Sequence, residues 1–220
     1  MHAIERALKS VLDRLNEQPK RLLHWYVLGT KSTPPPDLFK QRLVKRIGKE
    51  FNLKSFVETG TYRGDMTAAA ASVFDKVYSI EIFQPFYERA VARFANRPKV
   101  KILKGNSGED LKKLLTEIKE PALFWLDAHG GKTAKQPDGS ETAAPVRPEL
   151  EAILNHSLRD KHVILVDDIH TFVRGTKWGV GVWTQVEELR EKWLAAHPDW
   201  LWKVQDNVLH IYKKRDGVAS

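Results

Sequence analysis

The chain has 220 residues and a mass of 25.2 kDa, which fits one domain or one domain with a short appendage. Its hydrophobic share of 42% and charged share of 29% argue against wholesale disorder, and the lack of cysteine excludes disulfides, thiolate metal sites and a cysteine nucleophile. Most of the net charge of +8 lies in residues 1–56, which hold 12 Lys and Arg against 5 Asp and Glu. This excess indicates either a solvated helical face or a patch for an acidic partner such as nucleic acid, anionic lipid or a phosphorylated substrate.

The N-terminal quarter predicts a helical appendage. Apolar residues recur at helical spacing over 2–17, and the segment 21–29 is apolar and aromatic but too short to cross a membrane. Prolines at 34–36 end any helix, so we expect an appendage over 1–36 and the main domain over 37–220. The appendage is a candidate for a homodimer interface or for a cover over a pocket. The charged start of the chain does not have the pattern of a signal peptide, and we expect a cytoplasmic protein.

A second helix is predicted to follow the prolines, with Asp37 as its N-cap. Its apolar stripe includes Phe39, Leu43 and Ile47. The basic residues of this segment, Lys40 among them, are expected mostly off that stripe and therefore on the solvated face.

From residue 54 the chain alternates short apolar runs with helical patterns. The predicted strands cover residues 54–58, 76–81, 99–103, 122–127, 162–168, 200–205 and 207–214. The predicted helices between them cover residues 64–74, 84–95, 107–118, 146–156 and 183–196. This alternation indicates an open, mostly parallel α/β sheet covered by helices on both faces, closed by a hairpin with one antiparallel strand. In such sheets ligands bind at the carboxyl ends of the strands.

Polar residues follow the first three predicted strands, where a ligand of such a sheet would bind. The first strand ends in ETGTYRG, where Gly60 allows a tight turn that brings backbone N–H groups toward a ligand. The second ends in Glu81, 21 residues after Gly60, and an acid at this place commonly accepts hydrogen bonds from ribose hydroxyls. The third leads into Asn106 and Ser107, which suit an adenine edge. Together these residues indicate a cofactor that contains adenosine.

On these residues the chain resembles the class I S-adenosylmethionine-dependent methyltransferases, over residues 50–214. ETGTYRG is similar to the first motif of that superfamily, and Glu81 matches its ribose-binding acid. The resemblance implies S-adenosylmethionine as the cofactor and a Rossmann-like, seven-stranded, mostly parallel sheet with a reversed C-terminal strand. The residues that it assigns to cofactor binding are Glu58, Gly60, Thr61, Tyr62, Gly64, Glu81, Asn106, Ser107 and Asp127.

Three aspartates follow the fourth and fifth predicted strands. Asp127 lies in LDAH, and Asp167 and Asp168 lie in VDDIH. Carboxylates brought to one edge of a sheet repel one another unless a cation or a proton intervenes, and Mg²⁺ and Ca²⁺ prefer such oxygen ligands. The alternative is that one aspartate caps a helix and another pairs with a lysine such as Lys132.

This part of the chain resembles the metal-dependent O-methyltransferases of the catechol and macrocin/sugar types. The resemblance implies that Asp127, Asp167 and Asp168 hold Mg²⁺ or another divalent cation, which binds two adjacent hydroxyls of the acceptor. It places the general base just after Asp127, so that Asp127 and His129 are the candidate catalytic residues. The chain departs from the family pattern in the 40 residues between Asp127 and Asp167, a spacing produced by an insert over 129–147.

The resemblance therefore implies Mg²⁺-assisted O-methylation of a small hydroxylated acceptor, a sugar or a phenol of the natural-product or polysaccharide type. The insert is expected to form a lid. The loop 170–183, with Trp178 and Trp183, is expected to wall the acceptor pocket, and His170 either packs or lies beside the metal ligands.

Three other functions stay open on the sequence. The basic N-terminal quarter favours a nucleic-acid methyltransferase, although LDAH stands where base-amino methylation usually needs Asn-Pro-Pro-aromatic. The aspartates alone would suit a metal-dependent hydrolase. A non-catalytic scaffold on the same fold is the third alternative.

Overall fold

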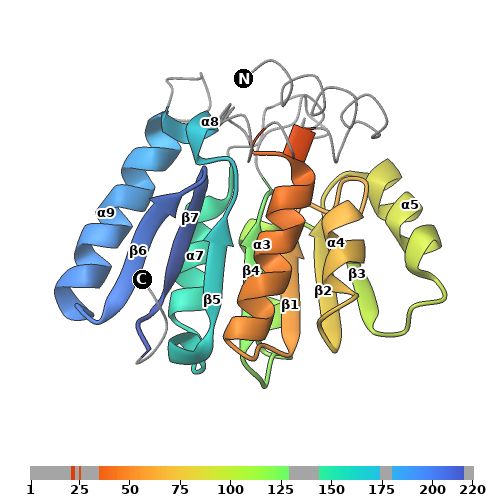
Figure 1. Ribbon diagram of the computed structural model, residues 1–220, viewed down its shortest axis with the longest axis horizontal. Coiled ribbons are helices and arrows are strands. Elements are labelled where there is room, and N and C mark those ends of the chain that lie inside the picture. The colour runs from red at the N-terminus through yellow and green to blue at the C-terminus, as the bar shows by residue number, and fades with distance from the viewer. Residues whose placement is uncertain (1–20, 23–24, 26–34, 129–143, 174–179, 216–220) are drawn as a thin grey trace, which may run out of the picture.

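The described part of the chain is built on one seven-stranded sheet with helices on both faces (Figure 1). The computed structural model describes residues 21–22, 25, 35–128, 144–173 and 180–215. The strand order is β3-β2-β1-β4-β5-β7-β6. The strands are β1 Ser55–Thr59, β2 Lys76–Glu81, β3 Val100–Lys104, β4 Ala122–Leu126, β5 Val163–Val166, β6 Trp200–Gln205 and β7 Val208–Lys213.

Strand β7 is the reversed strand of this sheet. It pairs antiparallel with β5 on one side and with β6 on the other, whereas β1 to β5 pair with one another in parallel. The two-residue turn between β6 and β7 is Asp206–Asn207, and both residues have positive φ angles, of 50° and 65°. Such a turn matches the twist of a hairpin. The predicted fold, a mostly parallel sheet with a reversed C-terminal strand, is confirmed.

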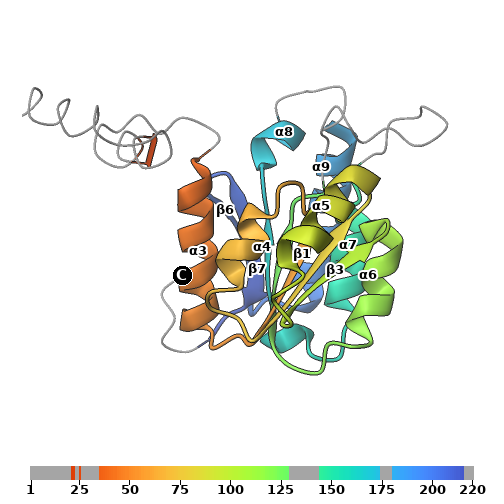
Figure 2. The ribbon, with the colours of Figure 1, turned by 90° about the vertical axis from the view of Figure 1, so that its right-hand side faces the viewer.

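Helices cover both faces of the sheet (Figure 2). Helices α3 and α4 lie on one face, and α6, α7 and α9 lie on the other. None of the described helices has an apolar stretch long enough to cross a membrane. The helices are α3 Asp37–Glu50, α4 Asp65–Ala70, α5 Gln84–Phe94, α6 Ser107–Leu115, α7 Val146–Leu154, α8 Ile169–Val173 and α9 Val180–Ala196, with a short 3₁₀ turn at Arg159–Lys161.

The central strands are buried on both faces, as the continuous apolar sequences of β4 and β5 predict. Every residue of β1, β4 and β5 is buried, and alternate side chains enter two separate cores. Val57 and Phe124 pack toward α6, α7 and α9, whereas Phe56 and Trp125 pack toward α3 and α4. The strand registers bring the ends of β1, β4 and β5 level with one another. The residues that follow these strands therefore meet at one edge.

The N-terminal boundary is only partly visible among the described residues. Leu22 and Trp25 are buried in the core beneath α3, and the Trp25 ring lies 4.4 Å from that of Phe39 between centroids. These two residues therefore pack on the domain; the rest of the proposed appendage, residues 1–20, 23–24 and 26–34, lies outside the described residues. Helix α3 begins at Asp37, but Pro36 is its N-cap and no side chain caps it. The prediction of Asp37 as N-cap is wrong, because Asp37 is already in the first turn.

The segment predicted as a loop over 170–183 is helical at both ends. Helix α8 begins at Ile169, and α9 begins at Val180. The N-terminus of α8 is capped from a distant part of the chain, because Asn207 accepts hydrogen bonds from the backbone N–H groups of Ile169 and His170. A cap that comes from the turn between β6 and β7 leaves no signal in the local sequence. Trp183 belongs to α9 and packs against the core, whereas Trp178 lies outside the described residues.

Candidate active site

The loop between β1 and α4 is shaped by two glycines at the carboxyl edge of the sheet. Gly60 has a φ of +85° and Gly64 a φ of +76°, which are conformations that favour glycine. A Cβ atom on Gly60 would lie 2.6 Å from the carbonyl oxygen of Asp127, so the loop touches the backbone at the end of β4. Between them Tyr62 has a φ of 49° and a half-exposed ring. The backbone conformation at Gly60 and Gly64, and the close approach of Gly60 to β4, therefore explain why glycine occupies these two positions.

The carboxylate of Glu58, at the end of β1, anchors this loop through hydrogen bonds. Its side chain is buried, and its Oε2 atom accepts hydrogen bonds from the hydroxyls of Thr67 and, at 2.6 Å, Ser79. The Ser79 hydroxyl also lies 2.6 Å from that of Thr61. Burial raises the pKa of Glu58 to about 7, although the two hydroxyl hydrogen bonds lower it. Thus Glu58 ties the loop to α4 and β2.

Glu81, the predicted ribose acid, lies at the end of β2 and is buried. One of its oxygens accepts a hydrogen bond from the backbone N–H of Tyr62 at 2.9 Å, and the other from that of Phe83 at 2.8 Å. These bonds fix the carboxylate beside the glycine loop. Each oxygen keeps a further lone pair with which to accept a hydrogen bond from a ligand.

Asn106 and Ser107, the predicted adenine-side residues, start α6. The Asn106 side chain caps this helix by accepting a hydrogen bond from the N–H of Gly108 at 3.1 Å. Ser107 is buried next to Glu149 of α7. Burial raises the pKa of Glu149 to about 7, although the nearby hydroxyls of Ser107 and Thr59 lower it. Neither carboxyl oxygen of Glu149 has a hydrogen-bond partner of normal geometry among the described residues.

The three aspartates predicted to meet do so at the ends of β4 and β5. Asp127, Asp167 and Asp168 form an acidic cluster in which one carboxylate oxygen of each lies within 4.8 Å of the others. Burial, and then the charge of Asp167, raise the pKa of Asp127 well above its ordinary value. Burial also raises the pKa of Asp167 to about 7, although Lys40 opposes this shift. The cluster therefore needs a positive charge to stay ionised.

That positive charge comes from Lys40 of α3, which sequence reasoning placed mostly off the buried stripe. Its Nζ atom lies 2.6 Å from Oδ2 of Asp167 and 2.9 Å from Oδ1 of Asp168. The side chain is 10% exposed. Burial alone would lower the pKa of Lys40, but the two aspartates outweigh burial and raise it above its ordinary value. The alternative pairing of an aspartate with a lysine is thus realised by Lys40; Lys132 lies outside the described residues.

A signal for Lys40 was present in the sequence. Lys40 precedes Leu43, Val44 and Ile47 by three, four and seven residues, which is the spacing of one helical face. All three of those residues are buried, and so is Lys40. A lysine at a buried helical position needs a carboxylate partner, and the aspartates after β5 were candidates for it.

Asn207, in the turn between β6 and β7, contacts the acidic cluster. The sequence did not predict this residue either. Its Nδ2 atom lies 3.3 Å from Oδ1 of Asp168, and its Oδ1 atom accepts the hydrogen bond from the N–H of His170 at 2.8 Å. The His170 ring lies against the same amide, with 2.9 Å between its Nδ1 atom and Nδ2 of Asn207. His170 is thereby placed next to the acidic cluster.

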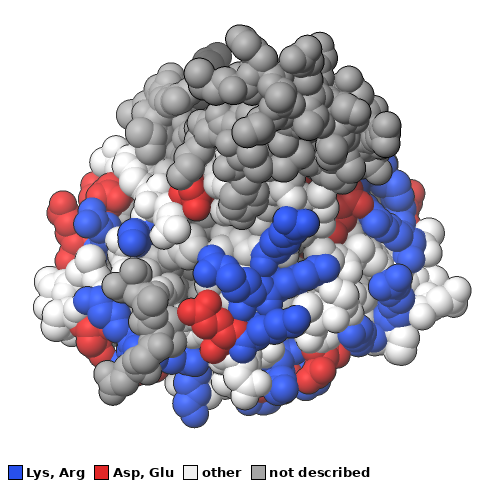
Figure 3. Space-filling view, viewed as in Figure 1, with Lys and Arg blue, Asp and Glu red and all other residues white. Residues whose placement is uncertain are grey.

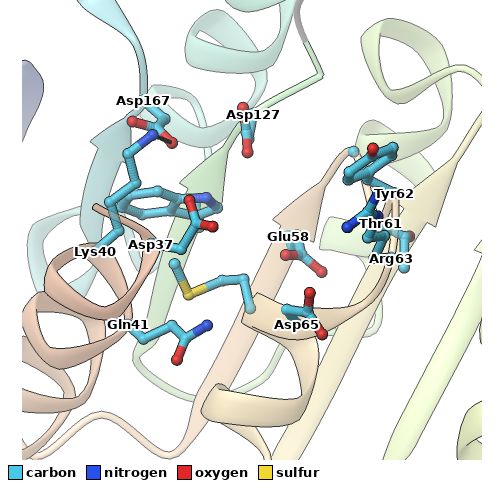
Figure 4. Close-up of a pocket in the computed structure, with 13 residues that line it drawn as sticks. Asp37, Lys40, Gln41, Glu58, Thr61, Tyr62, Arg63, Asp65, Asp127 and Asp167 are labelled. Carbon is cyan, nitrogen blue, oxygen red and sulfur yellow. Dashed lines mark hydrogen bonds and ion pairs between the residues drawn. The ribbon is translucent and has the colours of Figure 1, made fainter. Parts of the chain in front are cut away.

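A cavity of about 220 Å³ joins the glycine loop to the acidic cluster (Figure 4). Figure 4 shows Lys40 and Asp167 on one side and Tyr62 and Arg63 across from them, with Glu58 between. Five of the predicted site residues do not line it: Gly64, Glu81, Asn106, Ser107 and Asp168. His129 lies outside the described residues. The lining residues are Asp37, Lys40, Gln41, Glu58, Gly60, Thr61, Tyr62, Arg63, Asp65, Met66, Trp125, Asp127 and Asp167.

Two features of this cavity define the ligand that it would take. Its lining holds five acidic side chains and two basic ones, so the lining favours a ligand with positive charge and repels phosphate. The buried Nε1 atom of Trp125 has no hydrogen-bond partner among the described residues. A ligand oxygen in the cavity would satisfy that donor.

Several solved structures with a similar fold are methyltransferases. The O-methyltransferase from Bacillus cereus in complex with SAH shares 16% identity at a TM-score of 0.57, over 96% of this chain and 97% of that one. The SAH-bound methyltransferase from Podospora anserina shares 18% identity at a TM-score of 0.57, over 97% and 96%. An O-methyltransferase from Streptomyces achromogenes in complex with SAM shares 16% at a TM-score of 0.54, over 96% of each chain. The fold is therefore that of the class I S-adenosylmethionine-dependent methyltransferases, as the resemblance implied.

Sequence comparison does not extend this likeness. No family model matches the chain, and no curated protein matches it. The activity therefore has to be argued from the geometry of the site.

Proposed function

We propose that this protein is an S-adenosylmethionine-dependent methyltransferase. The observation that carries the proposal is the acidic cavity beside the glycine loop. S-adenosylmethionine brings a sulfonium and an ammonium group, whose positive charge complements the mostly acidic lining of the cavity. The fold supports the same cofactor, because similar structures hold SAM or SAH. A dinucleotide or ATP would bring phosphates to the same carboxyl groups.

The acceptor that we propose is a small hydroxylated molecule, a sugar or a phenol. In the transfer, an acceptor oxygen bonds to the methyl carbon while the carbon–sulfur bond breaks and its electron pair stays on sulfur. The hydroxyl proton leaves to a base, for which Asp127 in the cavity and His129 just after it are our candidates. The cavity meets the acidic cluster where such an acceptor would lie.

The magnesium ion implied by the resemblance does not fit this arrangement. The oxygens of Asp127, Asp167 and Asp168 are of the kind that Mg²⁺ prefers, but the Lys40 ammonium lies within 2.9 Å of two of the three carboxylates. In the transfer that we propose, Lys40 and not a metal ion neutralises this cluster.

The test is calorimetric titration of S-adenosylhomocysteine into the full chain, with ADP as the phosphate-bearing control. We expect saturable one-to-one binding of S-adenosylhomocysteine and none of ADP. Glu81→Ala should weaken the affinity by about 10- to 100-fold, since a hydrogen-bonded carboxylate contributes about 1–3 kcal/mol. Glu191→Ala, an exposed site on α9, is the matched control and should bind like the wild type. Absence of S-adenosylhomocysteine binding by folded protein would refute the proposal.

An RNA acceptor is a second candidate, favoured by the outer face of α3. Arg42, Arg46 and Lys49 are exposed there, and Lys45 is partly exposed. Figure 3 shows Lys and Arg side chains gathered at the centre of the face where α3 lies. Binding to a structured RNA with a steep salt dependence, lost in Arg42→Glu/Arg46→Glu, would favour this candidate over a small acceptor.

A further inference from the structure

The acidic cluster at the ends of β4 and β5 already contains a positive charge supplied by the chain. We propose that Lys40 is the resident cation of this cluster and keeps divalent metal ions out of it. Lys40 then has the electrostatic role that a metal ion would have, because it neutralises carboxylates that would otherwise repel one another. This inference concerns the chain itself and holds whether or not the proposed cofactor binds.

Lys40 and a metal ion would compete for the same oxygen atoms. Mg²⁺ binds carboxylate oxygens at about 2.0–2.1 Å. Oδ2 of Asp167 and Oδ1 of Asp168 already accept hydrogen bonds from Nζ of Lys40, at 2.6 and 2.9 Å. An ion on those oxygens would lie next to an ammonium group in a buried site, where like charges repel strongly. Metal binding therefore requires that Lys40 leave.

The helix that carries Lys40 makes that departure difficult. The neighbouring Phe39 is buried against Trp25, and Leu43 and Val44 lie in the core one turn later. The backbone of Lys40 is thereby fixed over the sheet edge, and only its flexible side chain can move. The Lys40 side chain is only 10% exposed, so it would have to move out of a buried position. That movement would break both of its ion pairs at once.

The same placement gives Lys40 a part in the reaction, and this part rests on the proposed function. An ammonium group has three N–H donors, and the two aspartates use two of them. Lys40 lines the cavity, so the third donor is available to an acceptor oxygen there. A hydrogen bond from a fixed cation would stabilise negative charge that develops on that oxygen as its proton leaves. Lys40 would then replace a metal ion as the group that orients the acceptor.

The test measures metal binding directly, with Mn²⁺ followed by its paramagnetic resonance signal in the full chain without cofactor. The variants are Lys40→Met, which removes the charge, and Lys40→Arg, which keeps it. Lys49→Met, on the exposed face of the same helix, removes an equal charge away from the cluster. We expect no saturable binding by the wild type, Lys40→Arg or Lys49→Met. Lys40→Met should bind one Mn²⁺ saturably, at least about tenfold more tightly than any residual binding by Lys49→Met.

Two outcomes would overturn the proposal. One is saturable Mn²⁺ binding by the wild type that Asp167→Asn abolishes, because the cluster would then be a metal site despite Lys40. The other is that Lys40→Met binds no better than Lys49→Met. If Lys40→Met does not fold, Lys40→Gln takes its place with the same expectation, since it also removes the charge and keeps a polar side chain.

A second readout distinguishes this inference from the proposed function. Mg²⁺ should raise the midpoint of thermal unfolding of Lys40→Met and leave that of the wild type unchanged, because a ligand stabilises only the folded protein that binds it. Neither measurement uses turnover or S-adenosylhomocysteine. Failure of cofactor binding would therefore refute the proposed function alone, whereas an equal Mg²⁺ effect in both proteins would refute the role of Lys40 alone.

Discussion

The two halves of the site are held together in different ways. On the cofactor side, the contacts join residues that are close in sequence, such as Glu58 with Ser79 and Tyr62 with Glu81, which lie 21 and 19 residues apart. On the acidic side, Lys40 pairs with Asp167 across 127 residues, and Asn207 meets Asp168 across 39. The cofactor side, which comprises the glycine loop with Glu58 and Glu81, is held by hydrogen bonds from hydroxyls and backbone N–H groups. The acidic side, which comprises Lys40 and the three aspartates, is held by buried ion pairs.

This difference predicts two kinds of sensitivity. Removing one partner of a buried ion pair leaves the other charge uncompensated, so the acidic side should lose stability sharply when a charge is removed. Both sides should respond to pH, because burial raises the pKa of Glu58 and Glu149 on the cofactor side and of Asp167 on the acidic side to about 7. The cofactor side should in addition respond to any atom added at the glycine turn.

Lys40→Met would break the acidic side and should have the largest effect. Breaking a buried ion pair typically lowers the free energy of unfolding by about 3–5 kcal/mol, and here one lysine serves two aspartates. Urea unfolding at neutral pH without divalent ions measures the loss. Lys49→Met should stay within about 0.5 kcal/mol of the wild type, because the side chain is exposed. Equal losses in the two variants would show that the buried pairing contributes nothing special.

Glu149→Gln tests the response of the cofactor side to pH. The pKa of Glu149 is about 7 in the folded chain and ordinarily 4.5. Below pH 4.5 the carboxyl group is protonated in both states and has no effect. As the pH rises from 4.5 through 7, only the unfolded chain ionises freely, so the wild type loses stability, by about 3 kcal/mol at most.

The comparison to make is the difference in unfolding free energy between Glu149→Gln and wild type, from pH 4.5 to 8.5. Because the glutamine side chain of the variant does not titrate, this difference should move in favour of the variant as the pH rises and level off above about pH 8. The buried His162 and His210, whose pKa values are lowered, remain in both proteins, so their effects cancel. A flat difference would mean that Glu149 ionises in the folded chain as easily as in water.

The sequence predicted the fold and the positions of the glycine loop and of Glu81 because their signals are local. Continuous apolar runs identified β4 and β5, and a glycine turn followed by an acid 21 residues later located Gly60 and Glu81. The three aspartates were also expected to meet, because parallel strands end at a common edge. Each of these inferences needs only the strand pattern and the rule that ligands bind at strand ends.

The remainder of the site depends on how distant segments pack. The rotation of α3 on the core decides which of its basic residues faces the sheet edge. The helical spacing of the buried residues indicates Lys40 only if a lysine is accepted as one of them. The cap of α8 by Asn207 depends on β7 lying beside β5. A pattern within one segment can indicate that Lys40 is buried, but it does not identify the distant residues that Lys40 and Asn207 contact.

Gly60→Ala would break the cofactor side while leaving Lys40 and its aspartates in place. The added Cβ would lie 2.6 Å from the carbonyl oxygen of Asp127, in a backbone conformation with a φ of +85°. We expect a loss of about 1–3 kcal/mol in unfolding free energy, which is typical of such backbone strain, together with weaker binding of S-adenosylhomocysteine. Gly181→Ala is the matched control, because the new Cβ on α9 meets no atom of the described residues within 4 Å. It should stabilise the helix by about 0.5–1 kcal/mol and leave binding unchanged. If Gly60→Ala were also neutral, the close approach of the loop to β4 would not constrain the site, and the cofactor side would tolerate substitution better than the acidic side.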